Sequence, residues 1–269
     1  IHRENKGLIV SLNELIEESR APLIARMDGD DVALPDRFAK QKAFLDAHPD
    51  HGMVGSWVTL IGETGEPLGH GGEKPVSADE IVANLAAGPL FSHPTVIFRT
   101  ELVRSVGGYR AAFRHCEDHE LWLRLADRTR MANLPERLLL YRVYPGQVSK
   151  RHFFEQIVNA YAARFVHEAC RDGRPDPSGD WSAVPPLDRI DAALGCPGVA
   201  AKIRAAVVDR LDFDPGVLAR EGYGLLRDHL RDANVDAGLI LRIVRRMAVA
   251  GHPARAARVA LALLGSRLR

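Results

Sequence analysis

The sequence has few cysteines, and they are not arranged as a cross-linked framework. Its three cysteines, Cys116, Cys170 and Cys196, are odd in number and widely spaced, and no CxxC pair is present. Disulfide scaffolds and zinc sites need paired or closely spaced cysteines. We therefore expect neither, and a reducing cytoplasmic compartment fits this composition best.

Long apolar runs are also missing. A membrane-spanning helix needs about 18 or more predominantly apolar residues, and no uninterrupted run of that length occurs. The N-terminus has no basic stretch followed by an apolar one, which is the pattern of an export signal. The sequence predicts neither a membrane span nor a signal peptide.

Acidic residues are absent from one end of the chain. Residues 237–269 hold seven arginines and no Asp or Glu. The remaining 236 residues carry 29 basic and 35 acidic side chains, a net charge of −6. Nucleic-acid binding needs a basic surface, so we do not expect it of the main body of this protein.

The residues that are present are those of a folded protein, with 46% hydrophobic and 26% charged side chains. Up to about residue 150, apolar runs typical of strands alternate with helical spacings, which predicts a layered α/β domain over 1–150. Helical patterns alone follow, so 151–269 is expected to be a helical region. The expected strands are 22–27, 53–61, 95–98 and 137–143, and the expected helices are 8–19, a helix beginning at Pro35, 79–87, 101–106, 117–126, 153–170 and roughly four more after a linker at 173–186.

An acidic loop follows the first expected strand. Asp28, Asp30 and Asp31 lie within four residues, directly after the apolar run 22–27, which we interpret as a buried strand. Ligands of open α/β sheets bind at the carboxyl edge of the strands. Two interpretations fit this loop: carboxylate ligands for Mg²⁺ or Mn²⁺, or a solvated turn. An EF-hand is excluded, because its twelfth position would be Ala39 and not a glutamate.

A second acidic pair, Glu117 and Asp118, opens the helix expected at 117–126. Carboxylates at this place are favoured by the helix dipole. One of them could accept a proton from an attacking hydroxyl group. The alternative is ordinary helix capping, with Glu120 and Arg124 as an ion pair one turn apart.

The order and spacing of several short motifs resemble those of bacterial family 2 glycosyltransferases. The resemblance extends over about residues 2–150. No single motif is decisive, but the ordered set is specific. The motifs are Asn5-Lys6-Gly7-Leu8, Leu12-Asn13, the segment 24–31 with Pro35 and Arg37, Ser92-His93-Pro94-Thr95, Phe98-Arg99, Gly107-Gly108-Tyr109-Arg110, Glu117-Asp118 with the segment 121–125, and Tyr141-Arg142.

This resemblance implies a GT-A fold, a nucleotide-sugar donor, a divalent metal (Mn²⁺ or Mg²⁺) and transfer with inversion at the anomeric carbon. Asp28 and Asp30 match the metal-binding DxD motif, and Asp31 is an additional acid beside the donor. Asp118 matches the catalytic base, and Glu117 supports it.

The resemblance also places residues around the transferred sugar. His93 and Trp122 match positions near the sugar or the acceptor, although each could equally be a core or rim residue. Arg142 matches a basic position near the diphosphate, where a cation would stabilise the leaving group.

Two features depart from the family pattern. Members begin with roughly 60 residues of strand, helix and strand that grip the nucleotide base. Ile1 follows the point where these would end, so we expect an N-terminally incomplete sheet with an unpaired edge. The chain would then form a homodimer, aggregate, or cover this edge with its own C-terminal helices. Many members also carry a histidine at the position of Tyr144, for which His152 is a weak substitute.

The basic segment 237–269 has an amphipathic pattern, with Leu239, Ile240, Ile243 and Met247 on one helical face. Two interpretations fit: this face packs on the preceding helices, or the segment makes a peripheral contact with the inner face of an anionic membrane. Apolar residues continue to Leu268.

The expected function is transfer of a sugar from a nucleotide-diphosphate donor to a saccharide or lipid-linked acceptor, in cell-surface polysaccharide synthesis. The alternative is a catalytically inactive binding or regulatory protein on a truncated glycosyltransferase fold. Titration with a nucleoside diphosphate and Mn²⁺ distinguishes the two.

Overall fold

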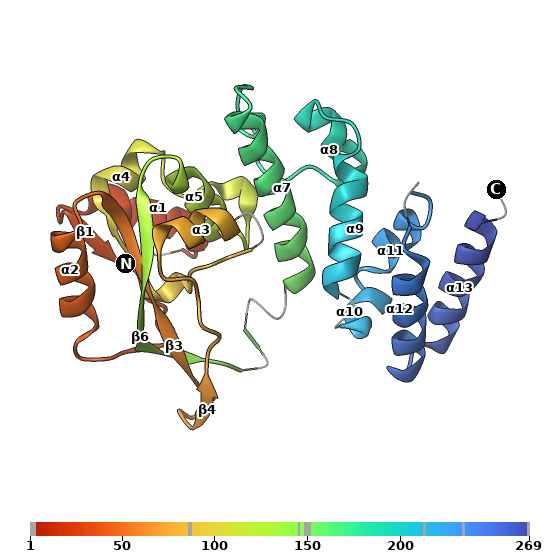
Figure 1. Cartoon of the computed structure of the whole chain (residues 1–269), viewed down its shortest axis with the longest axis horizontal. Helices are drawn as coiled ribbons and strands as arrows, with labels where there is room; N and C mark the ends of the chain where they lie inside the picture. Colours follow the sequence, from red (N-terminus) through yellow and green to blue (C-terminus); the bar gives the residue numbers. More distant parts are fainter. Residues whose placement is uncertain are drawn as a thin grey trace. The chain divides into compact units, whose positions relative to one another are not determined.

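The structure is a computed structural model of the whole chain and describes residues 4–85, 88–144, 146–147, 152–211, 214–232 and 235–267. It divides into an N-terminal unit, residues 1–151, and a C-terminal unit, residues 152–269. Figure 1 shows a sheet with flanking helices in the first unit and helices in the second. The predicted fold class, a mixed sheet flanked by helices and followed by a helical region, is confirmed.

Six described strands form one sheet in the order β1-β5-β3-β6-β2, with β4 paired to β3. The long central strands β3 and β6 run parallel, and every other described pair is antiparallel. The sheet is therefore mixed. The strands are β1 (Leu23–Ala25), β2 (Val32–Ala33), β3 (His51–Ile61), β4 (Pro67–His70), β5 (Ile97–Arg99) and β6 (Arg130–Arg142).

Helices cover the sheet because each buries an apolar side and begins or ends at a local signal. Helix α3 begins with a capping box in which Ser77 and Glu80 each accept the other's backbone N–H group. Helix α4 ends shortly before Gly107 and Gly108, whose φ angles of 81° and 67° favour glycine. The helices are α1 (Leu8–Glu18), α2 (Arg37–Ala47), α3 (Ala78–Asn84), α4 (Thr100–Ser105) and α5 (Glu117–Ala126).

Strand β1 is less buried than the sequence suggested. Leu23 and Ile24 are half-buried and Ala25 is exposed, so the interpretation of 22–27 as a buried strand was wrong. The reason is its place at the end of the strand order: among the described residues its single strand partner is β5. A strand paired on one side only leaves its outer backbone groups open.

Strand β6 is longer than predicted. The expected strand began at Arg137, but pairing to β3 begins at Arg130. Pro135 lacks an N–H group, and the register shifts where Leu134 pairs with Ser56 and Arg137 with Trp57. This irregularity divides the strand signal in the sequence, although the residues before it, such as Met131, are buried.

The C-terminal unit contains more helices than predicted. Six described helices follow the linker instead of about four, because α10 and α11 have only 5 and 7 residues and give weak periodic signals. Among the described residues, none of the helices has both the length and the apolar content of a membrane span. The helices are α7 (Phe153–Arg171), α8 (Leu187–Leu194), α9 (Val199–Leu211), α10 (Pro215–Ala219), α11 (Tyr223–His229), α12 (Ala237–Val249) and α13 (Pro253–Arg267).

Asn13 of α1 joins this helix to the loop after α4. Its side-chain amide donates to the carbonyl of Tyr109 at 2.8 Å, and its side-chain oxygen accepts the N–H group of Tyr109 at 2.8 Å. Gly108 leaves room for this contact, because a Cβ atom there would lie 2.6 Å from the Asn13 side-chain oxygen. One side chain thus satisfies both backbone groups of Tyr109.

We expect Asn13→Ala to lower the free energy of unfolding by about 2 kcal/mol, because each lost hydrogen bond contributes about 1 kcal/mol. Urea unfolding measures the change. Asn84→Ala is the matched control, because the Asn84 amide donates only to a carbonyl of its own exposed helix turn. Equal losses in the two variants would show that the contact between Asn13 and Tyr109 adds no stability.

Candidate functional site

The acidic loop lies directly after β1, and its first carboxylate is held by a buried arginine. The guanidinium of Arg26 contacts both carboxylate oxygens of Asp28, at 2.7 Å and 2.6 Å. Arg26 is buried, Asp28 is half-buried and Asp30 is exposed. A buried guanidinium needs an anionic partner, and this bidentate pair supplies one.

Asp31 is the buried acid of the loop. One of its carboxylate oxygens accepts the backbone N–H group of Arg142 at 2.8 Å, while the other is buried without a hydrogen-bond partner among the described residues. Burial, together with the charges of Asp28 and Asp30, raises the pKa of Asp31 to about 6. Ionised Asp31 is therefore disfavoured chiefly by burial and further by the two neighbouring carboxylates.

Arg142 matches a position near the diphosphate, but in the structure its guanidinium is directed at the backbone of the site. It donates to the carbonyl of Asp30 at 2.7 Å and to those of Gly62 and Glu63, each at 2.9 Å. With its own N–H group on Asp31, Arg142 fixes the acidic loop to the end of β6. Any contact with a diphosphate would be made from this held position.

The residues present fit a hard divalent cation. Asp28, Asp30 and Asp31 offer carboxylate oxygens, the ligands that Mg²⁺ and Mn²⁺ prefer. The buried Asp31 oxygen without a hydrogen-bond partner and the raised pKa of this residue both indicate a place where positive charge would be stabilising. Among the described residues these three carboxylates are not a preformed cage with every ligand atom within 4.8 Å of the others.

The second acidic pair begins α5 at the residue predicted from the sequence. Glu117 is buried, and burial, aided by the charge of Asp118, raises its pKa to about 7. Asp118 is half-buried, with 24% of its side chain exposed, and burial raises its pKa as well. One Asp118 oxygen accepts the N–H group of His119 at 2.7 Å.

The structure shows one of the two features that the capping interpretation predicted for this motif. Cys116, the residue before α5, forms no side-chain cap. Glu120 does pair with Arg124, at 2.7 Å and 2.6 Å. The structural role expected of this motif is thus filled by the pair of Glu120 and Arg124.

The structure brings the two acidic motifs together, although they are far apart in the sequence. Against the effect of burial, the charge of Arg26 lowers the pKa values of both Glu117 and Asp118, while the charge of Asp28 raises that of Asp118. His93 borders the second motif, with its Nδ1 atom 4.0 Å from an Asp118 oxygen. The two motifs therefore lie close enough for their charges to interact.

Arg26 is the residue of this site whose role the sequence analysis missed. It was noted only as part of the motif that ends in the acidic loop. A basic residue two positions before the first of several aspartates, at the end of a strand, was the available signal. Its influence on Glu117 and Asp118 depends on the fold and could not be read from spacing.

His93 and Trp122 occupy different depths. The Nε2 atom of His93 lies 2.9 Å from the Tyr109 hydroxyl, and burial, followed by the charge of Arg26, lowers the pKa of His93. Trp122 is fully buried, and its ring meets His93 and Phe91 edge-on, with ring centroids 5.8 Å and 6.0 Å apart. In this structure Trp122 supports His93 from the core, and its expected contact with the sugar stays a prediction.

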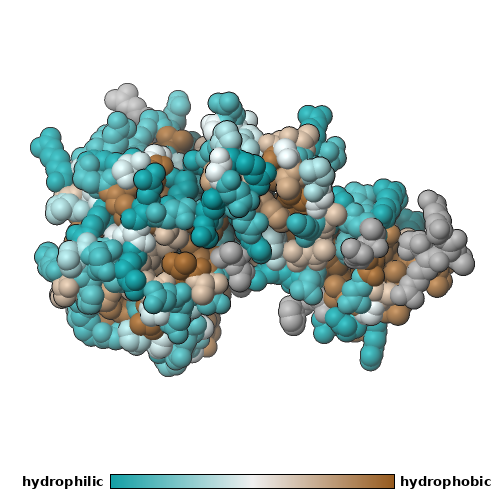
Figure 2. Space-filling model, turned by 45° about the horizontal axis from the view of Figure 1, so that its top comes forward, coloured by the Kyte–Doolittle hydropathy of each residue, from teal (hydrophilic) through white to brown (hydrophobic). Residues whose placement is uncertain are grey.

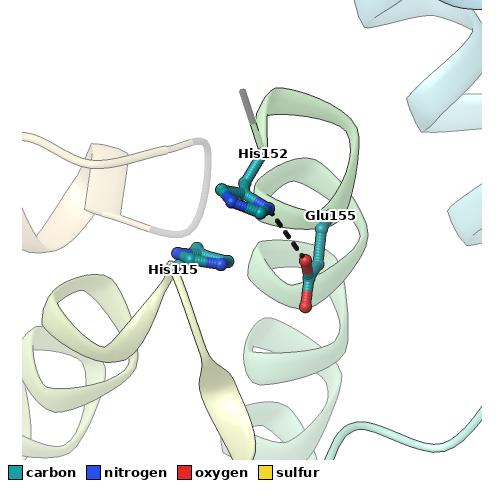
Figure 3. A group of neighbouring side chains, drawn as sticks. All are labelled: His115, His152 and Glu155. Carbon is teal, nitrogen blue, oxygen red and sulfur yellow. Dashed lines mark ion pairs between the residues drawn. The ribbon is translucent and has the colours of Figure 1, made fainter. Parts of the chain in front are cut away.

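His152, suggested as a substitute for a histidine at the position of Tyr144, belongs to the C-terminal unit. It immediately precedes α7, and its Nδ1 atom lies 3.5 Å from a carboxylate oxygen of Glu155 (Figure 3). This ion pair joins residues three apart at the start of one helix. A metal-binding role for His152 stays a sequence-based suggestion.

Comparison with known proteins confirms the family resemblance. Residues 1–107 match the family model described as "Glycosyl transferase family 2". The N-terminal part of the chain is thus similar in sequence to family 2 glycosyltransferases.

Named relatives match a similar part of the chain. An uncharacterized glycosyltransferase of Haemophilus influenzae is 36% identical over 57% of this chain and 57% of its own length. The amylovoran biosynthesis glycosyltransferase AmsE of Erwinia amylovora is 34% identical over 57% of each. The O-antigen biosynthesis glycosyltransferase WbnJ of Escherichia coli is 35% identical over 53% of this chain and 56% of its own length. The chain therefore spans less than two thirds of the length of these relatives.

The raised pKa of Glu117 predicts how stability depends on pH. Its folded-state pKa of about 7 lies above the ordinary value of 4.5, so the folded protein binds this proton more tightly than the unfolded chain. The stability that this group contributes is complete below about pH 4.5 and is lost as the pH rises to 7.

We expect Glu117→Gln, which cannot ionise, to escape this loss. Relative to the unchanged protein, the variant should gain on the order of 1–3 kcal/mol in unfolding free energy between pH 4.5 and pH 8. Urea unfolding at several pH values measures the difference, with Glu18→Gln on the exposed side of α1 as the control. A difference that does not change with pH would contradict the raised pKa.

Proposed function

We propose that this protein is an inverting glycosyltransferase that moves a sugar from a nucleotide-diphosphate donor to a hydroxyl group of a saccharide or lipid-linked acceptor. The observation that carries the proposal is the joint site of the two acidic motifs, in which burial and the charges of Arg26 and Asp28 act on the pKa of Asp118. Metal-assisted release of a diphosphate and removal of a proton from an acceptor must occur close together, and this arrangement supports both.

In the proposed reaction, Asp28 and Asp30 hold a divalent cation, Mn²⁺ or Mg²⁺, with Asp31 beside them. The cation would supply charge that neutralises the diphosphate leaving group. Arg142 keeps the acidic loop in place through the carbonyl of Asp30 and its own N–H group on Asp31. The chain thus contributes a loop whose position is set before the donor arrives.

Asp118 is the proposed base. A carboxylate that accepts the hydroxyl proton must be ionised when the acceptor arrives. Burial opposes ionisation of Asp118, whereas the hydrogen bond from His119 and the charge of Arg26 favour it. Glu117 remains protonated to a large extent near neutral pH, since its pKa is about 7. We therefore assign the base to Asp118 and a supporting place to Glu117.

His93 is proposed to line the sugar or acceptor side of the site. Burial lowers its pKa and keeps the ring neutral, so it can donate or accept a hydrogen bond without adding charge. Tyr109 fixes the ring from the other side through its hydroxyl group. A neutral, oriented imidazole suits recognition of sugar hydroxyls.

Polysaccharide synthesis is the proposed setting. The names of two relatives, an amylovoran biosynthesis glycosyltransferase and an O-antigen biosynthesis glycosyltransferase, support it. A cytoplasmic location is proposed from the three widely spaced cysteines, which are odd in number and contain no CxxC pair.

One prediction tests the metal. Asp30→Asn should abolish Mn²⁺-dependent binding of a nucleoside diphosphate, because a neutral amide is a poor substitute for a carboxylate ligand. Asp30 is exposed, so the variant should fold normally. Calorimetric titration with a panel of nucleoside diphosphates, with and without Mn²⁺, measures the loss.

The control for this experiment is Asp46→Asn, which removes an exposed carboxylate from α2. Nucleotide binding that survives unchanged in Asp30→Asn would remove this residue from the metal site. Absence of metal-dependent nucleotide binding in the unchanged natural protein would favour the catalytically inactive alternative.

Another prediction tests the base. In the natural protein, Asp118→Asn should lower turnover by at least about a hundredfold while donor affinity changes little. Asparagine keeps an oxygen that can accept the N–H group of His119, so the start of α5 should survive. Glu117→Gln should reduce turnover less. Near-normal turnover in Asp118→Asn would return this motif to a structural role.

A further inference from the structure

The last two described helices form a hairpin with one buried side. Helices α12 and α13 pack on each other, and α12 also contacts α10. Between them the chain turns at Gly251, whose φ angle is 88°, and α13 begins at Pro253. The apolar face predicted for α12 is thus packed against other helices, which confirms the packing interpretation and excludes a membrane contact through that face. The buried residues are Leu239, Ile240, Ile243, Met247, Ala256, Val259 and Leu263.

Away from its buried side, each helix of the hairpin exposes large apolar side chains. On α12, Leu241, Arg245 and Val249 are four residues apart, so they form one outward stripe. On α13, Leu261 and Leu264 are exposed. Leu241, Val249, Leu261 and Leu264 are 56%, 84%, 68% and 61% exposed. These four are among the five most exposed large apolar side chains in the described part of the chain.

This face also carries positive charge. Arg245 and Arg258 are exposed, and the sequence of 237–267 contains no acid that could offset them within the hairpin. The acid that directly precedes it, Asp236, accepts the N–H groups that open α12. Figure 2 shows apolar surface beside polar surface at the end of the chain where these helices lie.

The exposed apolar side chains and the exposed arginines together indicate which kind of partner could cover this surface of the hairpin. A second copy of this hairpin would bring more arginines but no acid to pair with them, since residues 237–267 contain none. A nucleic acid would bind the arginines through its phosphates but would leave Leu241, Val249 and Leu261 in water. A bilayer of anionic phospholipids offers phosphates to the arginines and an acyl boundary to the leucines.

We propose that the hairpin of α12 and α13 docks on the surface of an anionic phospholipid bilayer. The apolar stripe enters the boundary between headgroups and acyl chains, while the flanking arginines contact lipid phosphates. This inference does not depend on the proposed transferase activity, because it rests on the C-terminal unit alone.

Vesicle co-sedimentation of the full chain tests the proposal. Vesicles of phosphatidylcholine with phosphatidylglycerol should bind the protein, and vesicles of phosphatidylcholine alone should not. Binding should weaken as salt is added, because salt screens the contacts with the charged surface. Each arginine near an anionic surface contributes about fivefold in affinity.

Two pairs of exposed residues are changed separately. One double variant carries Arg245→Ser and Arg258→Ser, and the other carries Leu241→Ser and Leu261→Ser. Each double variant should bind vesicles at least about tenfold more weakly than the unchanged protein. The control is Val82→Ser with Arg128→Ser, an exposed apolar and basic pair in the N-terminal unit, which should leave binding unchanged. Every position changed is exposed, so the fold should be retained.

Several outcomes would overturn the proposal. One is a parent protein that does not bind anionic vesicles, and another is equal binding by the control and the two variants. Dimerisation that the leucine variant abolishes would instead identify a second copy as the partner. Tighter binding to duplex DNA than to anionic vesicles would identify a nucleic acid.

Discussion

The buried guanidinium of Arg26 holds the candidate site together. Arg26 pairs with Asp28 through both carboxylate oxygens, and its charge lowers the pKa values of Glu117 and Asp118 against the effect of their burial. Its own position is set by the backbone: its N–H group donates to the carbonyl of Val96, and its carbonyl accepts from Arg37. Burying several carboxyl groups in one place is costly unless such a charge is present.

Arg37 extends this arrangement into the core. It is fully buried, and it contacts Gln41, which in turn donates to the carbonyls of Val54 and Thr95. Burial lowers the pKa of Arg37 to about 10, which still leaves the side chain charged at neutral pH. The acidic loop is thereby connected to β3 and to the segment before β5 through two polar side chains of α2.

Local signals allowed much of the site to be predicted. The acidic loop follows a strand as expected, and α5 begins at Glu117, because an apolar run and a pair of acids at a helix start are visible over a few residues. The pairing of His93 with Tyr109 was not predictable in this way, and the sequence left open whether Trp122, which is fully buried, is a core residue. Both depend on contacts between segments that are distant in the sequence.

The fold shows the same division between local and long-range information. Helix bounds were predicted well where periodicity and glycines mark them, as at Gly107. The errors at β1 and β6 have another origin, since the burial of a strand depends on its neighbours in the sheet. Pro135 interrupts the pattern of β6, although the strand continues past it through a shift in register.

The hydrogen bonds of Arg142 also couple two loops that are separate in the sequence. Its guanidinium contacts the turn at Gly62 and Glu63 as well as the backbone of Asp30. The turn connects β3 to β4, whose four residues are all exposed. Lengthening or shortening that hairpin would therefore shift the acidic loop, so variation on the exposed edge of the sheet offers a way to adjust the site without changing any of its acids.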